Sequence, residues 1–546
     1  MALTKAHNRM IANSSVNVMD YIPAGTDTAT TDCTSYIQAA IDSLAATGGT
    51  LIFPDAELAI GNKIVFAGGV HYKGSAGGSS KLIKHPSFNT NNPDGDVMVV
   101  SKGWDTAAGY DGASYGVISD LAFDEGSHTN TYGDAIALGH ASNWVVERCS
   151  FFGMRFHGVD VTGCKNITVR DCKYYGTVGS SYNAFQVDQA ATNSIKGINA
   201  DNTGSENVQF LNNYVIGASV DSLGPQSAAF HIHRSNNKNI LIDGNFIENC
   251  DFFIQTDTGS TGNESIQVTN NRAKRGTVDG ASATFLKIRG EIADLIVTGN
   301  RTYQYNIDVS IDHPTTGGFS TDIIVANNSF NYAINRSVYI NQAYRANVHG
   351  NTIQGTSGDM VNAAIAFLGV NYFTCANNNI YDSDGDGIVV ESDAGGGISS
   401  NGLIHDNYIL NGDTGLVCTA ASTNNVLFYS NKTKGTFSTA ETNINQNLTN
   451  VRDLSFYQQE RTVSLAEAGR TINAGTTAQI NVTITGAVQG DMVIVGYDKD
   501  LQGLMVYGNM YGYQAGRIYI HNPTAGNITI ASGNWKVLAK SSRFIA

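Results

Sequence analysis

The chain has 546 residues with a formal net charge of −14, and only 15% of its residues are charged. This acidic balance, with no run of Lys or Arg, argues against a nucleic-acid partner and against an anionic membrane surface. No apolar stretch approaches the roughly 18 residues that a membrane-spanning helix needs, so we expect no membrane insertion. The 59 glycines and 7 prolines are typical of short strands joined by many turns.

The first segment with a clear pattern is a short amphipathic helix near the N-terminus. Residues 1–18 are polar, too few to fold alone, and lack the apolar core of a secretory signal. Apolar residues then recur at helical spacing ahead of a Gly-Gly pair and the strand 50–54, and they are Ile37, Ala40, Ile41 and Leu44. A single helix ahead of a repeat array is expected to cover the first coil, whose core and strand edges would otherwise face water.

An asparagine recurs in one frame through the middle of the chain, and apolar residues alternate before it. In one such segment, Ile240 and Ile242 are predicted to point inward, and Leu241 and Asp243 outward. The repeat length varies from 23 to 41 residues, and the internal period of two predicts a parallel β-solenoid of about 12 coils. The aligned positions are Leu121, Cys149, Cys172, Asn213, Asn245, Asn271, Asn300, Asn328, Asn351, Asn378, Asn407 and Asn431.

Two structural roles are predicted for the aligned asparagines. Asparagine tolerates left-handed backbone angles at the corners of a solenoid better than other residues that carry a side chain. Stacked coils also bring equivalent amides about 4.8 Å apart, where they can form a hydrogen-bonded ladder. The seven cysteines are odd in number and scattered, so we interpret them as buried free thiols of a reducing compartment.

The repeat is lost after residue 435, and the rest of the chain has a different pattern. Residues 436–455 are expected to be a linker. Beyond them, short alternating strands separated by turn residues predict an antiparallel β-sandwich over residues 456–546. The predicted strands of this domain are 479–484, 491–495, 517–520 and 527–530.

Two groups of residues near the N-terminus carry a family resemblance. The chain resembles the opening of pectate-lyase-like right-handed β-helix proteins in the motifs Val18-x-Asp20-Tyr21, Ala24-Gly25-Thr-Asp27, Asp32, Ile37-Gln38-Ala-Ala-Ile41-Asp42 and Gly48-Gly49-Thr-Leu-Ile-Phe-Pro54. Its first residues are similar to those of bacteriophage tailspikes and tail-associated polysaccharide depolymerases in Leu3-Thr4-Lys5, Met10 and Val16-Asn17-Val18.

The resemblance implies an all-β fold whose right-handed parallel β-helix occupies residues 116–435, behind an N-terminal cap and entry coils at 19–115. It also implies that residues 1–18 attach the protein to a phage tail or baseplate, and that three copies form a homotrimer in the virion. The implied partner is a bacterial surface polysaccharide, either capsule or O-antigen, and no cofactor is expected. The C-terminal domain would serve trimerisation or carbohydrate binding.

Outward positions on the strand before each asparagine motif form a predicted polar stripe. Stacked strands lie about 4.8 Å apart, so these side chains line up on one wall. In a chain with few charges, this gathering of carboxylates, histidines and cations indicates a polysaccharide groove. The stripe comprises Asp160, Gln186, Asp188, His231, His233, Gln255, Asp257, Lys287, Arg289, Glu291, Asp308, Asp312, Tyr339, Asn341, Glu391 and Asp393.

Two chemistries fit the stripe, and the sequence leaves both open. Glycoside hydrolysis needs two carboxyl groups about 5 Å or about 6.5–9.5 Å apart, which Asp160 with Asp188, or Asp257 with Asp308, can supply. A β-elimination on a uronic acid needs a cation and a base, and the candidates for these roles are Lys287, Arg289, His231 and His233. The remaining predicted substrate-binding residues are Gln186, Gln255, Glu291, Tyr339, Asn341 and Glu391.

No metal is assigned with these residues. Asp382, Asp384 and Asp386 copy the first half of a calcium loop, but the twelfth position is Asp393 where such loops carry Glu, so a solvated turn is the preferred interpretation. The leading hypothesis is a tailspike depolymerase that hydrolyses a bacterial surface polysaccharide. The alternatives are a polysaccharide lyase, a non-catalytic receptor-binding fibre, and a bacterial extracellular polysaccharidase.

Overall fold

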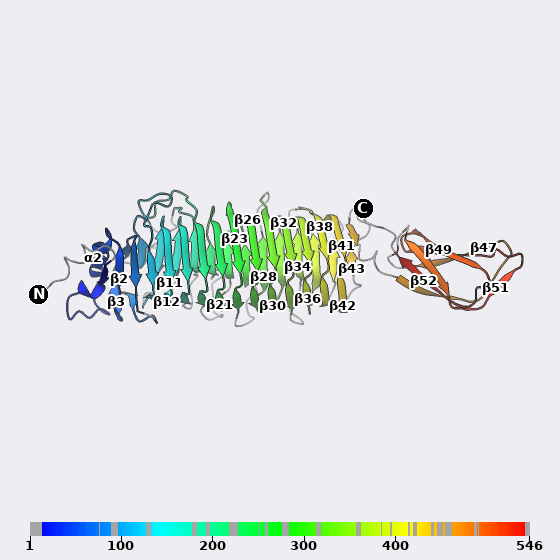
Figure 1. The fold of residues 1–546 in the computed structure, drawn as a ribbon, viewed down its shortest axis with the longest axis horizontal. Coiled ribbons are helices and arrows are strands. Elements are labelled where there is room, and N and C mark those ends of the chain that lie inside the picture. Colours follow the sequence, from blue (N-terminus) through cyan, green and yellow to red (C-terminus); the bar gives the residue numbers. More distant parts are fainter. Residues whose placement is uncertain are drawn as a thin grey trace. The chain divides into compact units, whose positions relative to one another are not determined.

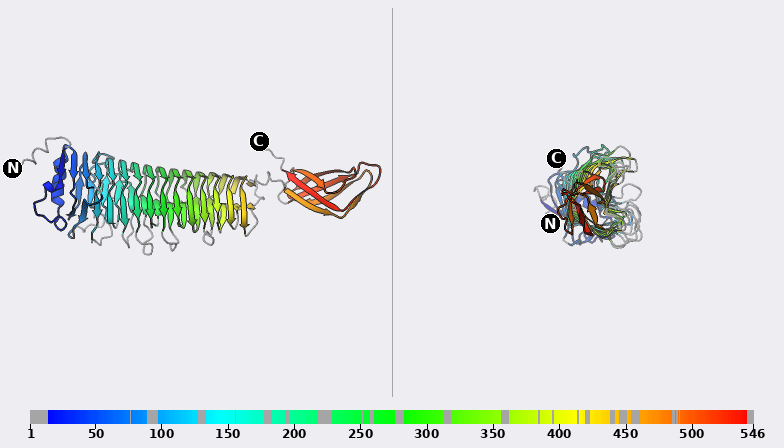
Figure 2. Two further views of the ribbon diagram at one scale, coloured as in Figure 1. Left: turned by 60° about the horizontal axis from the view of Figure 1, so that its bottom comes forward. Right: turned by 90° about the vertical axis from the view of Figure 1, so that its right-hand side faces the viewer.

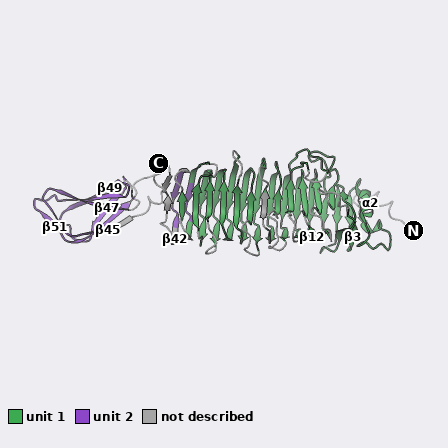
Figure 3. Cartoon of the chain, turned by 180° about the vertical axis from the view of Figure 1, so that it is seen from behind, with its two compact units in different colours: residues 1–402, 408–424, 433–443 green, residues 403–407, 425–432, 444–546 purple. Residues whose placement is uncertain are grey.

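The computed structural model describes residues 14–540 apart from several short internal segments. The segments outside the description are 76, 89–96, 127–132, 155, 177–182, 193–196, 218–227, 251, 257–259, 276–282, 313–317, 356–361, 384, 394–395, 413–414, 419–422, 438–441, 445–450, 454–460, 485–486, 488 and 490. The chain divides into two compact units, one holding most of the β-helix and the other the C-terminal domain with parts of the last coils (Figure 3).

The larger part of the chain is a parallel β-helix built from three sheets, which we call sheets A, B and C. Consecutive strands pass from sheet A to sheet B to sheet C and back to sheet A, one coil higher (Figures 1 and 2). Sheet A comprises β1 (Ser15–Asn17), β2 (Gly49–Ile52), β5 (Val70–Lys73), β8 (Val117–Ser119), β11 (Ser142–Glu147), β14 (Lys165–Arg170), β17 (Glu206–Leu211), β20 (Lys238–Asp243), β23 (Asn263–Thr269), β26 (Ile292–Thr298), β29 (Ser320–Ala326), β32 (Ala343–His349), β35 (Asn371–Ala376), β38 (Ser399–His405), β41 (Thr423–Tyr429) and β44 (Val451–Asp453).

Sheets B and C each contain 14 strands in the described part of the chain, more than the predicted 12 coils require. Sheet B comprises β3 (Glu57–Ile60), β6 (Lys81–Lys84), β9 (Ala122–Asp124), β12 (Ser150–Met154), β15 (Lys173–Gly176), β18 (Tyr214–Ile216), β21 (Phe246–Glu248), β24 (Arg272–Lys274), β27 (Arg301–Tyr303), β30 (Ser329–Ala333), β33 (Thr352–Gly355), β36 (Asn379–Tyr381), β39 (Tyr408–Gly412) and β42 (Lys432–Phe437). Sheet C comprises β4 (Ile64–Phe66), β7 (Val99–Ser101), β10 (Ile136–Gly139), β13 (Val159–Thr162), β16 (Asn183–Asp188), β19 (Ala228–Ile232), β22 (Phe252–Thr256), β25 (Thr284–Ile288), β28 (Ile307–Asp312), β31 (Arg336–Asn341), β34 (Ala363–Leu368), β37 (Asp386–Glu391), β40 (Leu416–Cys418) and β43 (Thr442–Ile444).

The predicted alternation is confirmed on sheet A. Ile240 and Ile242 are buried, whereas Leu241 and Asp243 face outward and are partly exposed. Ile240 pairs in register with Val208 on one side and Ile266 on the other, so apolar side chains form a continuous column inside the β-helix. Burial of such columns is the main favourable contribution to the stability of the fold.

The aligned asparagines form the predicted ladder inside the corner between sheets A and B. The amide of Asn271 donates to Asn300 Oδ1 at 3.0 Å and to the carbonyl of Ile242 at 2.9 Å. Its own Oδ1 accepts from the backbone N–H and the amide of Asn245 at 2.9 and 3.0 Å. These bonds satisfy polar groups that would otherwise be buried without partners.

The other predicted role of these asparagines, a left-handed backbone conformation at the corner, is wrong. The left-handed backbone angles belong to the residue just before each ladder position, such as Asn270 with φ of 55° and Gly299 with φ of 69°. The left-handed residue makes the corner, and the asparagine after it turns its amide inward to join the column. Asn and Gly recur at the corner position because both accept this conformation at low cost.

The helix α2 (Thr34–Leu44) lies at the N-terminal end of the β-helix and packs against β2 and β4. The four predicted apolar residues, Ile37, Ala40, Ile41 and Leu44, are all buried. β1, preceded by the described residue Ser14 and followed by the short 3₁₀ turn η1 (Val18–Asp20), pairs with β2. The first complete coil therefore begins at residue 49, within the range expected for entry coils.

The β-helix continues further than the sequence indicates. Strands β42, β43 and β44 add to sheets B, C and A across the segment 436–455, which was expected to be a linker. The C-terminal domain is antiparallel, with a six-stranded sheet in the order β45-β52-β48-β49-β50-β47 and a two-stranded sheet of β46 and β51. These strands are β45 (Arg461–Glu467), β46 (Arg470–Ile472), β47 (Thr477–Thr483), β48 (Met492–Tyr497), β49 (Met505–Gly512), β50 (Ala515–His521), β51 (Ile528–Ile530) and β52 (Gly533–Lys540).

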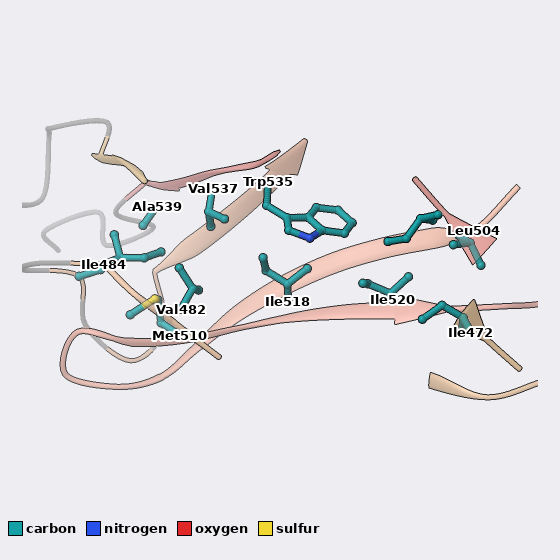
Figure 4. Close-up of a cluster of buried hydrophobic side chains, with 12 residues drawn as sticks. Ile472, Val482, Ile484, Leu504, Met510, Ile518, Ile520, Trp535, Val537 and Ala539 are labelled. Carbon is teal, nitrogen blue, oxygen red and sulfur yellow. The ribbon is translucent and has the colours of Figure 1, made fainter. Parts of the chain in front are cut away.

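The C-terminal domain has its own apolar core, as the predicted sandwich pattern requires. Trp535, Ile518 and Ile520 are fully buried at its centre, with Ile472 from the smaller sheet (Figure 4). Ile530, also from the smaller sheet, belongs to the same core. All seven cysteines of the chain are free and buried, which confirms that they form no disulfide framework. In the part of the chain that the structure describes, no helix is long and apolar enough to cross a membrane.

Candidate active site on sheet C

The outer face of sheet C carries two parallel columns of side chains, because its strands pair in register from coil to coil. The first column continues along the sheet as Ala137, Asp160, Gln186, His231, Gln255, Lys287, Ser310, Tyr339, Ala366, Val389 and Val417. The second contains Thr162 paired with Asp188, and, further along, Asp312, Asn341, Leu368 and Glu391. The predicted outward positions therefore line up along the sheet, but the stripe is not continuously polar, since Ala366, Val389 and Val417 occupy its C-terminal half.

A buried acid–base cluster lies at the N-terminal end of this face. Asp134 Oδ1 is 2.9 Å from His157 Nδ1, and Asp160 Oδ2 is 4.0 Å from the same nitrogen. Asp160 lies on β13, whereas Asp134 and His157 lie just before β10 and β13 on successive coils. All three side chains are buried. Within the described residues they form the one group of His, Cys, Asp or Glu with spacing suited to a metal ion.

The cluster perturbs the protonation of its members. Burial, together with the charges of Asp134 and Asp188, raises the pKa of Asp160 to about 7, although His157 opposes the shift. Burial also disfavours the charged imidazole of His157, but Asp134 and Asp160 outweigh it and raise the pKa of that histidine. Thr162 donates to Asp160 Oδ1 at 3.0 Å, while Asp160 Oδ2 has no hydrogen-bond partner. Groups perturbed in this way gather at functional sites more often than elsewhere.

The segment that follows β16 packs over the part of the face next to this cluster. Ala190 and Ile198, from that segment, pack with Trp104 against Val100 and Ala137, the outward residues that precede Asp160 in the first column. The sheet face is therefore covered here, although the strand pattern alone would leave it open to water.

Asp188, one coil further along the second column, sits in a different electrostatic environment. Its Oδ2 accepts from Arg234 at 2.6 Å and lies 3.0 Å from His233 Nδ1. The carboxylate of Asp188 is fully buried, while the side chains of His233 and Arg234 are 28% and 24% exposed. A protonatable carboxyl group at Asp160 and an ion-paired carboxylate at Asp188 thus lie on adjacent strands.

Polar side chains of the first column lie next to the two carboxyl groups. His231 Nδ1 lies 3.1 Å from Gln186 Oε1 and 2.8 Å from the amide of Asn183. The rings of His231 and His233 are 4.9 Å apart. The structure therefore brings together five of the predicted site residues: Asp160, Gln186, Asp188, His231 and His233.

The prediction that Asp308 faces outward is wrong. Asp308 is fully buried, and its Oδ1 accepts from the buried hydroxyl of Thr302, on sheet B, at 2.6 Å. The strand enters sheet C here with two successive residues turned inward, so the simple alternation fails at its first position. Burial raises the pKa of Asp308 to about 7, while the hydrogen bond from Thr302 and the nearby hydroxyl of Ser337 act in the opposite direction. This carboxyl group belongs to the interior of the β-helix.

The C-terminal half of the face holds charged residues that are accessible. Lys287 lies on β25 with Arg289 just after it, and both are partly exposed. Burial and then Arg289 lower the pKa of Lys287, against the effect of Asp312. Asn341 donates to Asp312 Oδ1 at 2.8 Å.

The remaining predicted residues lie apart from the buried cluster. The guanidinium of Arg336 lies 4.6 Å from the ring centre of Tyr339. Glu391 lies at the end of β37, and Glu291 lies beyond sheet C, where its N–H donates to Ser260. Asp257 lies outside the described residues, and for Gln255 only the backbone position in the column is described.

The turn at Asp382–Asp386, whose sequence copies half of a calcium loop, is described only in part. Asp382 adopts a left-handed φ of 52°, and Asp386 begins β37, where it pairs with Ala363. Asp384 lies outside the described residues.

The sequence interpretation missed Asp134, His157 and Arg234, because it considered only outward positions within strands. Asp134 and His157 occupy equivalent positions before strands of successive coils, since Ala135 N–H donates to the His157 carbonyl.

Comparison with known proteins supports the fold assignment. A family model described as a right-handed β-helix region matches residues 111–273. No curated protein matches the sequence. Among solved structures, the surface adhesin PfbA of Streptococcus pneumoniae superposes with a TM-score of 0.53 and 18% identity, covering 81% of this chain and all of the adhesin chain. A variant tailspike protein of E. coli bacteriophage HK620, in complex with a pentasaccharide, gives a TM-score of 0.51 and 13% identity, covering 97% and 94% of the two chains.

These likenesses define the class of the protein by its architecture. The chain is a right-handed parallel β-helix protein with an antiparallel C-terminal β-domain. At identities this low, the solved structures establish the fold alone.

Proposed function

We propose that this protein binds a polysaccharide along the outer face of sheet C and hydrolyses it with Asp160 and Asp188. The observation that carries the proposal is the contrast between two carboxyl groups on adjacent strands. The pKa of Asp160 is raised to about 7, so this group keeps a proton near neutrality, whereas Asp188 is ion-paired with Arg234. Glycoside hydrolases use such a pair, one carboxyl group as acid and the other as base or nucleophile.

The spacing of the two strand positions is compatible with an inverting mechanism. Asp160 pairs in register with Gln186, and Asp188 follows two residues later, which places the two Cα atoms roughly 8 Å apart. Carboxyl groups about 6.5–9.5 Å apart leave room for an attacking water, whereas retaining enzymes hold them at about 5 Å. In this proposal Asp160 protonates the leaving oxygen, and Asp188 activates the water. Both carboxyl groups are buried in this structure, so a sugar must reach them from the side of the partly exposed His233 and Arg234.

A second candidate function is supported by Lys287. Its lowered pKa favours the neutral amine that a general base requires, and Arg289 next to it can neutralise a uronic acid carboxylate. These are the two groups that a polysaccharide lyase needs for β-elimination. A non-catalytic glycan-binding fibre is the third candidate function, and the similarity of the fold to that of an adhesin is compatible with it.

The cleavage assay distinguishes these functions. Purified protein is incubated with capsular and O-antigen polysaccharides from candidate hosts, and the size of the products is followed by chromatography. New reducing ends without ultraviolet absorbance of an unsaturated uronate indicate a hydrolase, and the absorbance indicates a lyase. Binding without shortening of any glycan rejects both enzymatic functions.

We further propose a place for the protein at the tail of a bacteriophage, acting on the surface of the host cell. The resemblance of the N-terminal residues to tailspikes supports attachment of residues 1–18 to the tail or baseplate, and it also supports a homotrimer. Light scattering on the purified full chain tests the trimer, because a monomeric mass excludes it. Pull-down of tail proteins by the full chain, but not by a chain lacking residues 1–18, tests the attachment.

A further inference from the structure

Two arginines face each other across adjacent strands on the outer face of sheet B. Arg272 on β24 pairs in register with Arg301 on β27, and both side chains are exposed. Adjacent strands are about 4.8 Å apart, so the two positive charges are held close together. Their neighbours in the same column are Phe246 and Ser329, which carry no charge. Like charges directly opposite each other destabilise a sheet.

Elsewhere this β-helix compensates facing charges. On sheet A, the column of Lys165, Glu206, Lys238 and Glu264 alternates in sign from coil to coil. Its lysine and glutamate side chains form ion pairs of 3.1 and 2.9 Å. Arg272 and Arg301 depart from this alternation, and within the described residues neither forms an ion pair. The departure suggests that the opposite charge comes from outside the chain.

The two arginines border a hollow of about 460 Å³, which we call the sheet B cleft. Its lining includes Phe246, Arg272, Lys274, Arg301, Tyr303 and Gln304. Lys274 pairs in register with Glu248, but that carboxylate accepts from the Tyr214 hydroxyl at 3.3 Å and forms no ion pair with the lysine. Three cations therefore converge on one hollow in a chain whose net charge is −14.

The aromatic residues of the sheet B cleft are held in place by their neighbours. The ring of Phe246 stacks on Tyr214 with 5.3 Å between ring centres. Tyr303, which is 38% exposed, makes an edge contact of 5.0 Å with Tyr332. Fixed rings of this kind offer apolar surfaces to the C–H faces of a sugar, while guanidinium groups bind carboxylates through paired hydrogen bonds.

We infer that the sheet B cleft binds an acidic saccharide, with Arg272, Lys274 and Arg301 holding its carboxylates and Phe246 and Tyr303 contacting its rings. The cations occupy only two adjacent strands, which matches one or two acidic sugar units rather than a long polyanion. A nucleic acid would also meet the repulsion of the strongly negative chain. This site lies on a different sheet from Asp160 and Asp188, so the inference does not depend on the proposed hydrolysis.

The test compares trigalacturonate with maltotriose, a neutral trisaccharide, and with a short single-stranded oligonucleotide, by calorimetry on the full chain. We expect trigalacturonate to bind, with an affinity that falls as salt is added, and the other two probes to bind weakly or not at all. The double variant Arg272→Ala/Arg301→Ala should lose at least about tenfold in affinity. Lys238→Ala, which removes an exposed cation from sheet A, is the matched control and should bind normally.

A second variant separates lost binding from lost folding. Arg301→Glu places an acid opposite Arg272 and restores the alternation seen on sheet A, so its melting temperature should equal or exceed that of the wild type. Its affinity for trigalacturonate should nevertheless fall by about tenfold or more. The inference is overturned if wild type does not bind trigalacturonate, or if either arginine variant binds it as well as wild type. Tighter binding of maltotriose or the oligonucleotide, or loss of trigalacturonate binding in Asp160→Asn, overturns it as well.

Discussion

The two halves of the outer face of sheet C differ although the same strands repeat along it. Near β13 and β16 the face is covered, and Asp160 and Asp188 are fully buried in contrasting electrostatic environments. Near β25 to β37 the charged groups Lys287, Arg289 and Asp312 are accessible, and the first column becomes apolar. Equivalent positions of a repeat therefore share backbone geometry but not chemistry, because the segments between the strands decide which positions lose contact with water.

Asp160→Asn gives the largest expected effect on activity. The substitution removes the proton that the leaving group needs while keeping the size of the side chain. Loss of a general acid reduces the rate by about 10²–10⁴-fold, and binding of the glycan should be retained. Measurement of reducing ends released per minute checks this expectation. If the variant keeps wild-type turnover, Asp160 is not the general acid, and the catalytic residues are expected near β25 to β37 instead.

Arg234→Ala tests whether the buried half depends on charge compensation. Removal of the guanidinium leaves the carboxylate of Asp188 buried without its 2.6 Å partner. Breaking a fully buried ion pair costs about 3–5 kcal/mol. Arg234 is partly exposed and His233 stays 3.0 Å from Asp188, so we expect a smaller loss of stability, seen as a lower melting temperature, together with a large loss of turnover. The double variant Arg234→Ala/Asp188→Asn is the control and should recover stability but not activity.

Asp308→Asn tests whether the interior carboxyl group affects only stability or also catalysis. The folded protein holds the proton of Asp308 up to about pH 7, whereas an unfolded aspartate releases it near its ordinary pKa of 3.8. The folded state therefore binds more protons between these values, and the free energy of unfolding falls as pH rises through this window. The asparagine variant lacks this slope, so at pH 8 it should be more stable than wild type by up to about 4 kcal/mol.

Melting curves of wild type and Asp308→Asn at pH 5 and pH 8 provide the measurement. The advantage of the variant should be clearly larger at pH 8 than at pH 5, and glycan cleavage should be unchanged at both values. Reduced cleavage with an unchanged melting temperature would instead place Asp308 in the catalytic machinery.

Lys287→Gln should have the smallest effect if hydrolysis is correct. The lysine lies four strands from Asp160 in the first column, and its loss should change turnover less than about threefold, as for a peripheral contact. Initial rates on the same polysaccharide give the comparison. Complete loss of activity, with retained activity in Asp160→Asn, would establish the lyase function instead.

Much of the fold could be predicted from the sequence because its signals are local and repeated. Alternation around Ile240 and Ile242, the helix face of Ile37 and Ile41, and the asparagine frame each follow from backbone periodicity. The last coils at 436–455 were missed because they lack the aligned asparagine, which was the strongest marker of the repeat.

The candidate site could be predicted only in part. Register from coil to coil places Asp160, Gln186 and His231 in one column, and this follows from the repeat alone. The burial of Asp160 could not be predicted, because the alternation within strands does not show where residues outside the strands pack, as Ile198 does over the neighbouring Ala137. The inward turn of Asp308 was also beyond the pattern, since a corner lets two successive side chains face the interior.

The asparagine ladder makes the rise of a coil along the β-helix axis independent of the number of residues in that coil. The same bond of 3.0 Å, from a backbone N–H to an asparagine Oδ1, joins residues 23 positions apart, as between Asn328 and Asn351, and residues 41 positions apart, as between Cys172 and Asn213. Extra residues between two ladder positions therefore extend outward from the stack, and the coils above and below keep their spacing. A protein built on this frame can exchange whole surface segments, and with them its ligand preference, while the stack beneath stays intact.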